Sequence, residues 1–146
     1  MEQRMSVITI GASDLPAMRA FYEEKLGWKP VAVNKDIVFY KMNGFLFSIG
    51  KGKDLASVIG VSNEGSGFRS VTFGYNVQTE DEVQALYRQL QEKGVKMLTT
   101  PTNPPFGGLF FYFEDIEGNI LEVAYNPFVP MDEENNAIGH ESIAHL

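Results

Sequence analysis

The chain repeats one order of structural elements, and this duplication constrains its fold more than any other feature of the sequence. Residues 6–12 and 68–77 are strand-like runs, and each leads into a helix-like segment with apolar residues three and four apart. The two helix-like segments end at Gly27 and Gly94, as helices with a C-terminal glycine do. Three strand candidates follow in each half. We therefore predict an α+β fold built from two β-α-β-β-β modules.

Local signals set the bounds of the predicted elements. Ser13 or Asp14 can cap the first helix, and Thr79 can cap the second. Asn43-Gly44 is a strong hairpin signal between two of the strands. The strands predicted after the helices are residues 28–33, 37–42 and 45–49 in the first half, and residues 95–99, 109–114 and the strand around Glu122 in the second. The halves are joined by a predicted linker, residues 51–67, with a single helical turn near residues 54–59.

Glu122 is the residue that fits its predicted strand least well, because it is a carboxylate within an apolar run. Burying an unpaired carboxylate costs several kcal/mol. Strand alternation predicts that Glu122 points away from Leu121 and Val123, toward the concave side of the sheet. Three pairs of glycines align the two halves: Gly11 with Gly74, Gly27 with Gly94, and Gly44 with Gly118. This alignment places Val7 opposite Ser70, and Ser48 opposite Glu122.

Composition limits the class of partner and the chemistry available. The 146 residues are 44% hydrophobic, carry a net charge of −7 and include no cysteine. Disulfides, zinc–thiolate sites and cysteine nucleophiles are therefore excluded, and nucleic acid and anionic membranes are disfavoured as partners. No apolar run reaches the roughly 18 residues of a membrane span, and no signal peptide is recognisable. A cytoplasmic location is the resulting expectation.

Two longer motifs resemble a known family. They are ITIGASDLPAMRAFYEEKLGWKP at residues 8–30 and GGLFFYFEDIEGNILEVAYNP at residues 107–127, and they are similar to motifs of the vicinal oxygen chelate superfamily, which includes glyoxalase I, extradiol dioxygenases and bleomycin-resistance proteins. The resemblance spans about residues 4–128. It implies that the two modules form an open, mostly antiparallel eight-stranded barrel and that the chain forms a homodimer. Residues 1–128 are then one domain, with module 1 at 4–50, the linker at 51–67 and module 2 at 68–128, followed by an acidic tail at 129–146.

The resemblance also implies where a metal ion would bind. In metal-using members, the first and last strands of each module supply the ligands, and the matching positions here are Val7, Ser48, Ser70 and Glu122. Only Glu122 is a good ligand, because transition ions need several converging imidazole, carboxylate or thiolate groups. We therefore expect no cofactor, with a divalent metal ion as the alternative. The only histidines, His140 and His145, belong to the tail and are expected at the surface, unless the tail folds back over the cleft.

Glu122 has three open roles in this sequence. It can pair with a lysine or arginine, bind a cationic or hydrogen-bond-donating ligand, or act as a general base. Tyr112 and Phe106 are the predicted aromatic contacts of a ligand. Tyr112 lies in the aromatic run 109–113, whose alternate side chains line the cavity, and Phe106 lies in the loop 104–108, a candidate flap.

Two functions are consistent with these residues. In the first, the protein binds a small aromatic or cationic molecule without a metal, in the manner of bleomycin-resistance proteins, and its ligand site comprises Glu122, Ser48, Ser70, Phe106 and Tyr112. In the second, it is a glyoxalase-like lyase or isomerase that depends on a divalent ion, with Glu122 as its catalytic residue. The sequence leaves open whether the protein is an enzyme.

Overall fold

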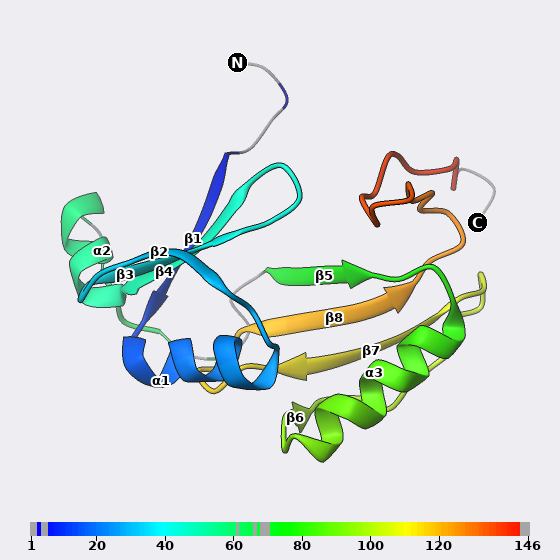
Figure 1. Cartoon of the computed structure of the whole chain (residues 1–146), viewed down its shortest axis with the longest axis horizontal. Helices are drawn as coiled ribbons and strands as arrows, with labels where there is room; N and C mark the ends of the chain where they lie inside the picture. Colours follow the sequence, from blue (N-terminus) through cyan, green and yellow to red (C-terminus); the bar gives the residue numbers. More distant parts are fainter. Residues whose placement is uncertain (1–2, 4–5, 61, 66, 68–70, 144–146) are drawn as a thin grey trace. The chain divides into compact units, whose positions relative to one another are not determined.

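Each half of the chain builds one four-stranded mixed sheet (Figure 1). The computed structural model describes residues 3, 6–60, 62–65, 67 and 71–143. The chain divides into two units, Met1–Gly67 and Phe68–Leu146. Each sheet contains one parallel and two antiparallel strand pairs. Within the described residues no strand pairing joins the two sheets, so the predicted α+β fold of two modules in an open, mostly antiparallel arrangement is confirmed.

The first unit follows the predicted order of elements. They are β1 (Val7–Ala12), α1 (Leu15–Ala20), the π-helix η1 (Phe21–Lys25), β2 (Pro30–Val33), β3 (Ile37–Lys41), β4 (Leu46–Lys51) and α2 (Gly52–Ile59), and the sheet order is β1-β4-β3-β2. The side chain of Asp14 accepts a hydrogen bond from the backbone of Ala17, which confirms the predicted cap. The core packs aromatic rings closely: the rings of Tyr22 and Trp28 are 4.9 Å apart, and Tyr40 and Phe47 are buried beside Tyr22.

The second unit repeats this plan around a longer helix. Its elements are β5 (Thr72–Asn76), α3 (Glu80–Glu92), β6 (Lys96–Met97), β7 (Leu109–Glu114) and β8 (Ile120–Tyr125), in the sheet order β5-β8-β7-β6. Thr79 caps α3 as predicted, through a hydrogen bond from the backbone of Glu82. The helix packs on β7 and β8, and its buried Val83 and Leu90 belong to the same core as Phe111 and Val123 (Figure 1). This packing leaves the opposite face of the sheet without a helix of this unit.

Three elements differ from the predictions made from sequence. The predicted linker contains a complete helix, α2, which Gly60 ends in the left-handed conformation at φ 80°. The strand predicted at 95–99 has only two residues, Lys96–Met97, in the ladder with β7. The tail is folded beyond β8, where a bridge pairs Met131 with Ala137. The start predicted for β5, at residues 68–70, lies outside the described residues.

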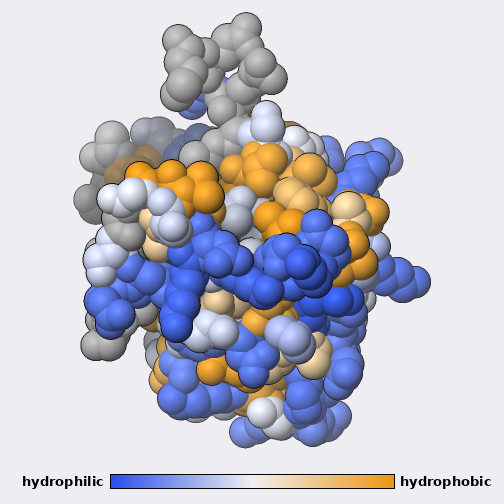
Figure 2. All heavy atoms as spheres, turned by 90° about the vertical axis from the view of Figure 1, so that its left-hand side faces the viewer, coloured by the Kyte–Doolittle hydropathy of each residue, from blue (hydrophilic) through white to orange (hydrophobic). Residues whose placement is uncertain are grey.

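The surface of the first unit mixes hydrophilic and apolar atoms. The side that carries α2 shows hydrophilic atoms interrupted by separate hydrophobic patches (Figure 2). Val58 and Ile59 at the end of α2 are exposed in this unit. No helix in the described part of the chain is both long and apolar enough to cross a membrane.

Candidate functional site

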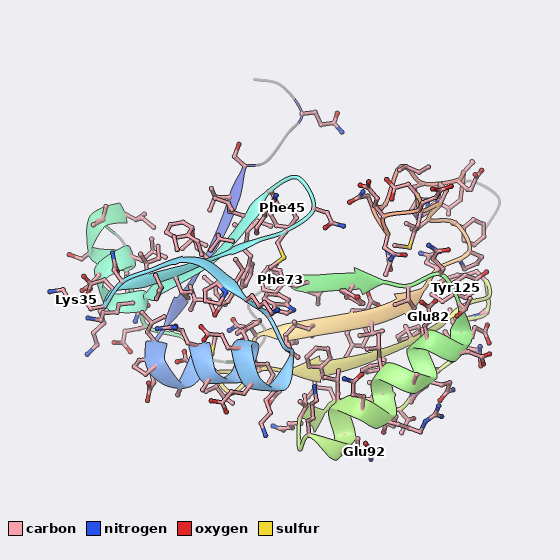
Figure 3. The ribbon with its side chains drawn as sticks, in the orientation of Figure 1. Lys35, Phe45, Phe73, Glu82, Glu92 and Tyr125 are labelled. Atoms are coloured by element: carbon pink, nitrogen blue, oxygen red, sulfur yellow. The ribbon has the colours of Figure 1, made fainter. Side chains whose placement is uncertain are left out.

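The strand register of the second unit places Glu122 on the face of its sheet opposite α3. Glu122 on β8 lies between Gly74 on β5 and Tyr112 on β7, each its direct partner across the ladder. Its neighbours Leu121 and Val123 are buried and belong to the side that α3 covers. Phe73 and Tyr125, labelled in Figure 3, mark β5 and the end of β8, while Glu82 and Glu92 mark the first turn and the end of α3. The predicted alternation of this strand therefore holds.

Tyr112 is the hydrogen-bond partner of Glu122. The phenol donates to the carboxylate, and this bond is the main reason why the pKa of Tyr112 rises to about 12, with burial adding to it. A phenol with this pKa stays protonated near neutral pH and keeps donating. The pair therefore holds the side chain of Glu122 in place.

No cation neutralises Glu122 within the described residues. Ion pairs in this part of the chain join Arg19 to Glu23, Lys51 to Asp36, and Lys96 to Glu114. Glu114 lies two residues from Tyr112 and so shares its side of β7. The pairing with lysine or arginine that the sequence left open for Glu122 is thus replaced by a pairing with a neutral tyrosine.

The two sides of the Glu122 carboxylate are lined differently. On the β7 side, the ring of Phe110 lies 5.5 Å from that of Tyr112 in an edge-to-face arrangement. On the β5 side, Gly74 is exposed and has no side chain. A Cβ atom built on Gly74 would lie 3.7 Å from Oε2 of Glu122, with no other described heavy atom within 4 Å. The carboxylate is therefore bordered by aromatic rings on one side and by open space on the other.

Ser48 occupies the corresponding position in the first unit but is not available to a ligand. It is fully buried, and its hydroxyl is 2.6 Å from that of Thr9, its partner on β1. Ser70, the other serine of the predicted site, lies outside the described residues. Thr9 was missed from sequence, because only the pairing of β1 with β4 brings it to Ser48.

Strand pairing also shifts the predicted alignment of the two halves. Gly11 pairs with Gly50, whereas Gly74 pairs with Glu122. With Ser48 and Glu122 equivalent, the counterpart of Gly74 is Thr9, and the counterpart of Val7 is Thr72 and not Ser70. The alignment of Gly11 with Gly74 is therefore wrong by two residues.

Phe106 belongs to a second aromatic cluster, beyond the ends of β7 and β8. A turn closes between Pro104 and Gly107, and Phe106 is 47% exposed. Its ring lies 6.4 Å from that of Phe128, which stacks in turn on His140 at 6.3 Å. The exposed His140 is thus held against the second unit, and His145 lies outside the described residues.

At four positions metal-using members of the family supply metal ligands, and the side chains of this chain at those positions do not suit a divalent ion. After the correction of register they are Val7, Ser48, Thr72 and Glu122, which offer one carboxylate, two hydroxyls and a side chain with no donor atom. One of those hydroxyls already bonds to Thr9. The part of the chain that the structure describes also has no group of three or more His, Cys, Asp or Glu residues that could hold a metal ion. Divalent ions require several such ligands.

Comparisons with known proteins point to one family. The model of the Glyoxalase/Bleomycin resistance protein/Dioxygenase superfamily matches residues 4–123. A glyoxalase-related enzyme from Fulvimarina pelagi is 37% identical, with a TM-score of 0.85 over 95% of this chain and 99% of that one. A glyoxalase/bleomycin resistance protein/dioxygenase from Nocardioides is 18% identical, with a TM-score of 0.77 over 97% of this chain and 91% of its own.

A genomically encoded fosfomycin resistance protein from Listeria monocytogenes is also similar. It is 20% identical, with a TM-score of 0.67 over 86% of this chain and 95% of its own. At this identity, as for the Nocardioides protein, the similarity is one of fold. No curated protein matches the chain.

Proposed function

The chain belongs to the glyoxalase/bleomycin resistance protein/dioxygenase superfamily, and from this premise we propose that it binds a small aromatic or cationic molecule at Glu122 without a family-type metal site. The proposal rests on the hydrogen bond that Glu122 accepts from Tyr112. Glu122 is half-buried, its hydrogen bond comes from a phenol, and the described ion pairs join other residues, so its carboxylate can accept a further hydrogen bond from a ligand. A hydrogen bond to a charged group is roughly twice as strong as a neutral one.

The aromatic residues beside Glu122 suit the same class of ligand. Tyr112 lies directly across the ladder from Glu122, and the ring of Phe110 lies 5.5 Å from that of Tyr112. A cation that lies within about 6 Å of such a ring gains attraction from its π electrons, and a flat aromatic ligand can pack against it. Carboxylate and rings together favour a ligand with a positive or hydrogen-bond-donating group attached to an apolar body.

Glu122→Gln tests this proposal directly. The amide oxygen still accepts the hydrogen bond from Tyr112, so we expect the free energy of unfolding to change by less than about 1 kcal/mol. Binding should weaken about tenfold or more, because a charge-assisted bond becomes a neutral one. The ligand is first found by a thermal-shift screen of aromatic amines and cationic antibiotics, since binding to the folded state raises the unfolding midpoint.

Glu114→Gln is the matched control on the same strand face. Glu114 is paired with Lys96, so its neutralisation should leave ligand affinity unchanged. A loss of about 3–5 kcal/mol in Glu122→Gln with affinity intact would instead identify Glu122 as half of a buried ion pair, and the binding proposal would fail.

A second candidate function is supported by one comparison. The protein that is 37% identical over 95% of this chain is described as a glyoxalase-related enzyme. In this candidate the chain is a divalent-metal-dependent lyase or isomerase, and Glu122 is its catalytic residue. Metal analysis of the purified protein separates the two candidates: stoichiometric nickel, zinc or manganese that is lost in Glu122→Ala would favour the enzyme.

A further inference from the structure

Gly74 lies in strand β5, and no described backbone atom comes close enough to it to require a glycine there. Glycine weakens a strand and often marks a place where backbone or a ligand comes close. Gly11 is of the first kind, because a Cβ atom there would lie 2.8 Å from Cα of Gly52. At Gly74 the nearest described atom is Oε2 of Glu122, at 3.7 Å from such a Cβ, and the backbone is not in the left-handed region. Alanine would therefore fit at Gly74, yet the chain has glycine.

We propose that Gly74 leaves room for the donor group of the ligand, and that this group is a primary ammonium or an amidinium and not a quaternary ammonium. The inference rests on the proposed function, since it assigns the ligand class of the same site. A charged N–H donor must come within about 2.7–2.9 Å of a carboxylate oxygen. The space over Gly74 lies beside Oε2 of Glu122, so a donor placed there reaches that oxygen.

Cations with N–H groups and quaternary ammonium ions differ in whether they can donate a hydrogen bond to Oε2 of Glu122. A primary ammonium offers three N–H donors on a small group, and an amidinium offers donors in one plane. A quaternary ammonium has no N–H, and its methyl groups hold the charge away from the oxygen. The rings of Phe110 and Tyr112 attract all of these cations, so the hydrogen bond over Gly74 provides the discrimination.

Gly74→Ala and Gly50→Ala form a matched pair of variants. A Cβ atom on Gly50 would also meet its nearest neighbour at 3.7 Å, but that neighbour is the apolar Ile37 in the first unit. Neither position needs a left-handed backbone, so both variants should fold, which circular dichroism and the unfolding midpoint verify. Only Gly74→Ala puts a methyl group into the space beside Glu122.

The probes are benzylammonium and benzyltrimethylammonium, and binding is measured by NMR titration or calorimetry. We expect the wild type to bind benzylammonium about tenfold more tightly than benzyltrimethylammonium. Gly74→Ala should weaken benzylammonium binding about tenfold, because the methyl group displaces the donor from Oε2. Gly50→Ala should bind both probes as the wild type does.

The outcomes separate this inference from the proposed function. If Glu122→Gln loses benzylammonium binding while Gly74→Ala retains it, the role of Gly74 is refuted and the proposed function stands. If Glu122→Gln retains binding, the proposed function itself is refuted. Equal affinity of the wild type for the two probes, or no binding of benzylammonium, overturns the assignment of the ligand class.

Discussion

At the scale of single residues, each unit contains a tyrosine that donates a hydrogen bond to a glutamate, but only one of the two glutamates also pairs with a described cation. In the first unit Tyr40 donates to Glu23 at 3.3 Å, and Arg19 pairs with the same carboxylate at 2.9 Å. In the second unit Tyr112 donates to Glu122 without a described cation. Glu23 is therefore paired with a cation in a structural cluster, whereas Glu122 has a tyrosine beside it and no cation among the described residues.

The two tyrosines give a prediction about titration. The pKa of Tyr40 is raised to about 12 mainly by burial, and that of Tyr112 is raised to about 12 mainly by the hydrogen bond to Glu122. We expect the pKa of Tyr112 in Glu122→Gln to fall toward its ordinary value of about 10, because the neutral amide no longer disfavours the phenolate. Tyr40 serves as the internal control, and ring NMR signals followed against pH distinguish the two among the six tyrosines.

The same shift has a defined sign for stability. A phenol with a pKa above its unfolded value binds more protons in the folded state, so stability falls as pH rises. The contribution of Tyr112 is complete below about pH 10 and is lost as pH passes through about 12. A Tyr112 signal that titrates identically in Glu122→Gln and the wild type would contradict the pairing of these side chains.

The sequence was sufficient for the residues whose role depends on strand alternation alone. Alternation along β8 predicted that Glu122 points to the concave side, and alternation in the run 109–113 predicted Tyr112 among the side chains that line the cavity. Gly74 and Thr9 were missed, because each becomes relevant only through its partner on a neighbouring strand. Such partners depend on register, and single-strand patterns do not determine register.

At the scale of elements, two loops of the second unit have the same construction. In the turn between β7 and β8, Asp115 accepts hydrogen bonds from the backbone of Glu117 and Asn119 and from the side chain of Asn119. In the tail, Asp132 accepts the equivalent three bonds from Glu134 and Asn136. These bonds to the carboxylate lower the pKa of Asp132.

The two aspartates differ in burial, and this difference gives a prediction. Asp115 is 2% exposed and Asp115→Ala should destabilise the fold by about 1–3 kcal/mol, because buried donors lose their acceptor. Asp132→Ala should have a clearly smaller effect, since water can replace the carboxylate in the tail. Urea unfolding of both variants measures the difference. Equal losses would mean that the tail loop is as integral to the fold as the hairpin.

The element predictions succeeded where capping and periodicity agree. Asp14 and Thr79 cap their helices as predicted, because a side-chain oxygen before an amphipathic run is a local signal. The helix α2 was underestimated because its segment is rich in Gly, Ser and Lys, and its stability comes from contact with β1 and β4. The fold of the tail was missed, because acidic composition alone suggests a solvated chain.

At the scale of the whole molecule, the duplication was recognised but its register was not. The alignment of Gly11 with Gly74 is displaced by two residues from the one that the strand pairs require. A shift of two returns every side chain to the same face of a strand, so the hydrophobic pattern is identical in both registers. The metal-ligand position of the second module therefore moved from Ser70 to Thr72.

The edge strands of the two sheets favour self-association. Strands β1 and β5 each end their sheet, and each exposes a large apolar side chain, with Val7 44% and Tyr75 58% accessible. Exposed edge strands with apolar side chains pair readily with another copy. We therefore expect a homodimer whose mass by sedimentation equilibrium is twice the 16.3 kDa of one chain.

Tyr75→Lys should shift this equilibrium toward the monomer, because a two-fold interface brings the same patch of both copies together and opposes like charges. Val58→Lys is the control, since Val58 is 88% exposed but lies on the helix α2 and not on a strand. Equal dissociation by the two substitutions would locate the contact elsewhere. A wild-type mass of 16.3 kDa at every concentration would rule out the dimer, and the two edge strands would then have to remain unpaired in solution.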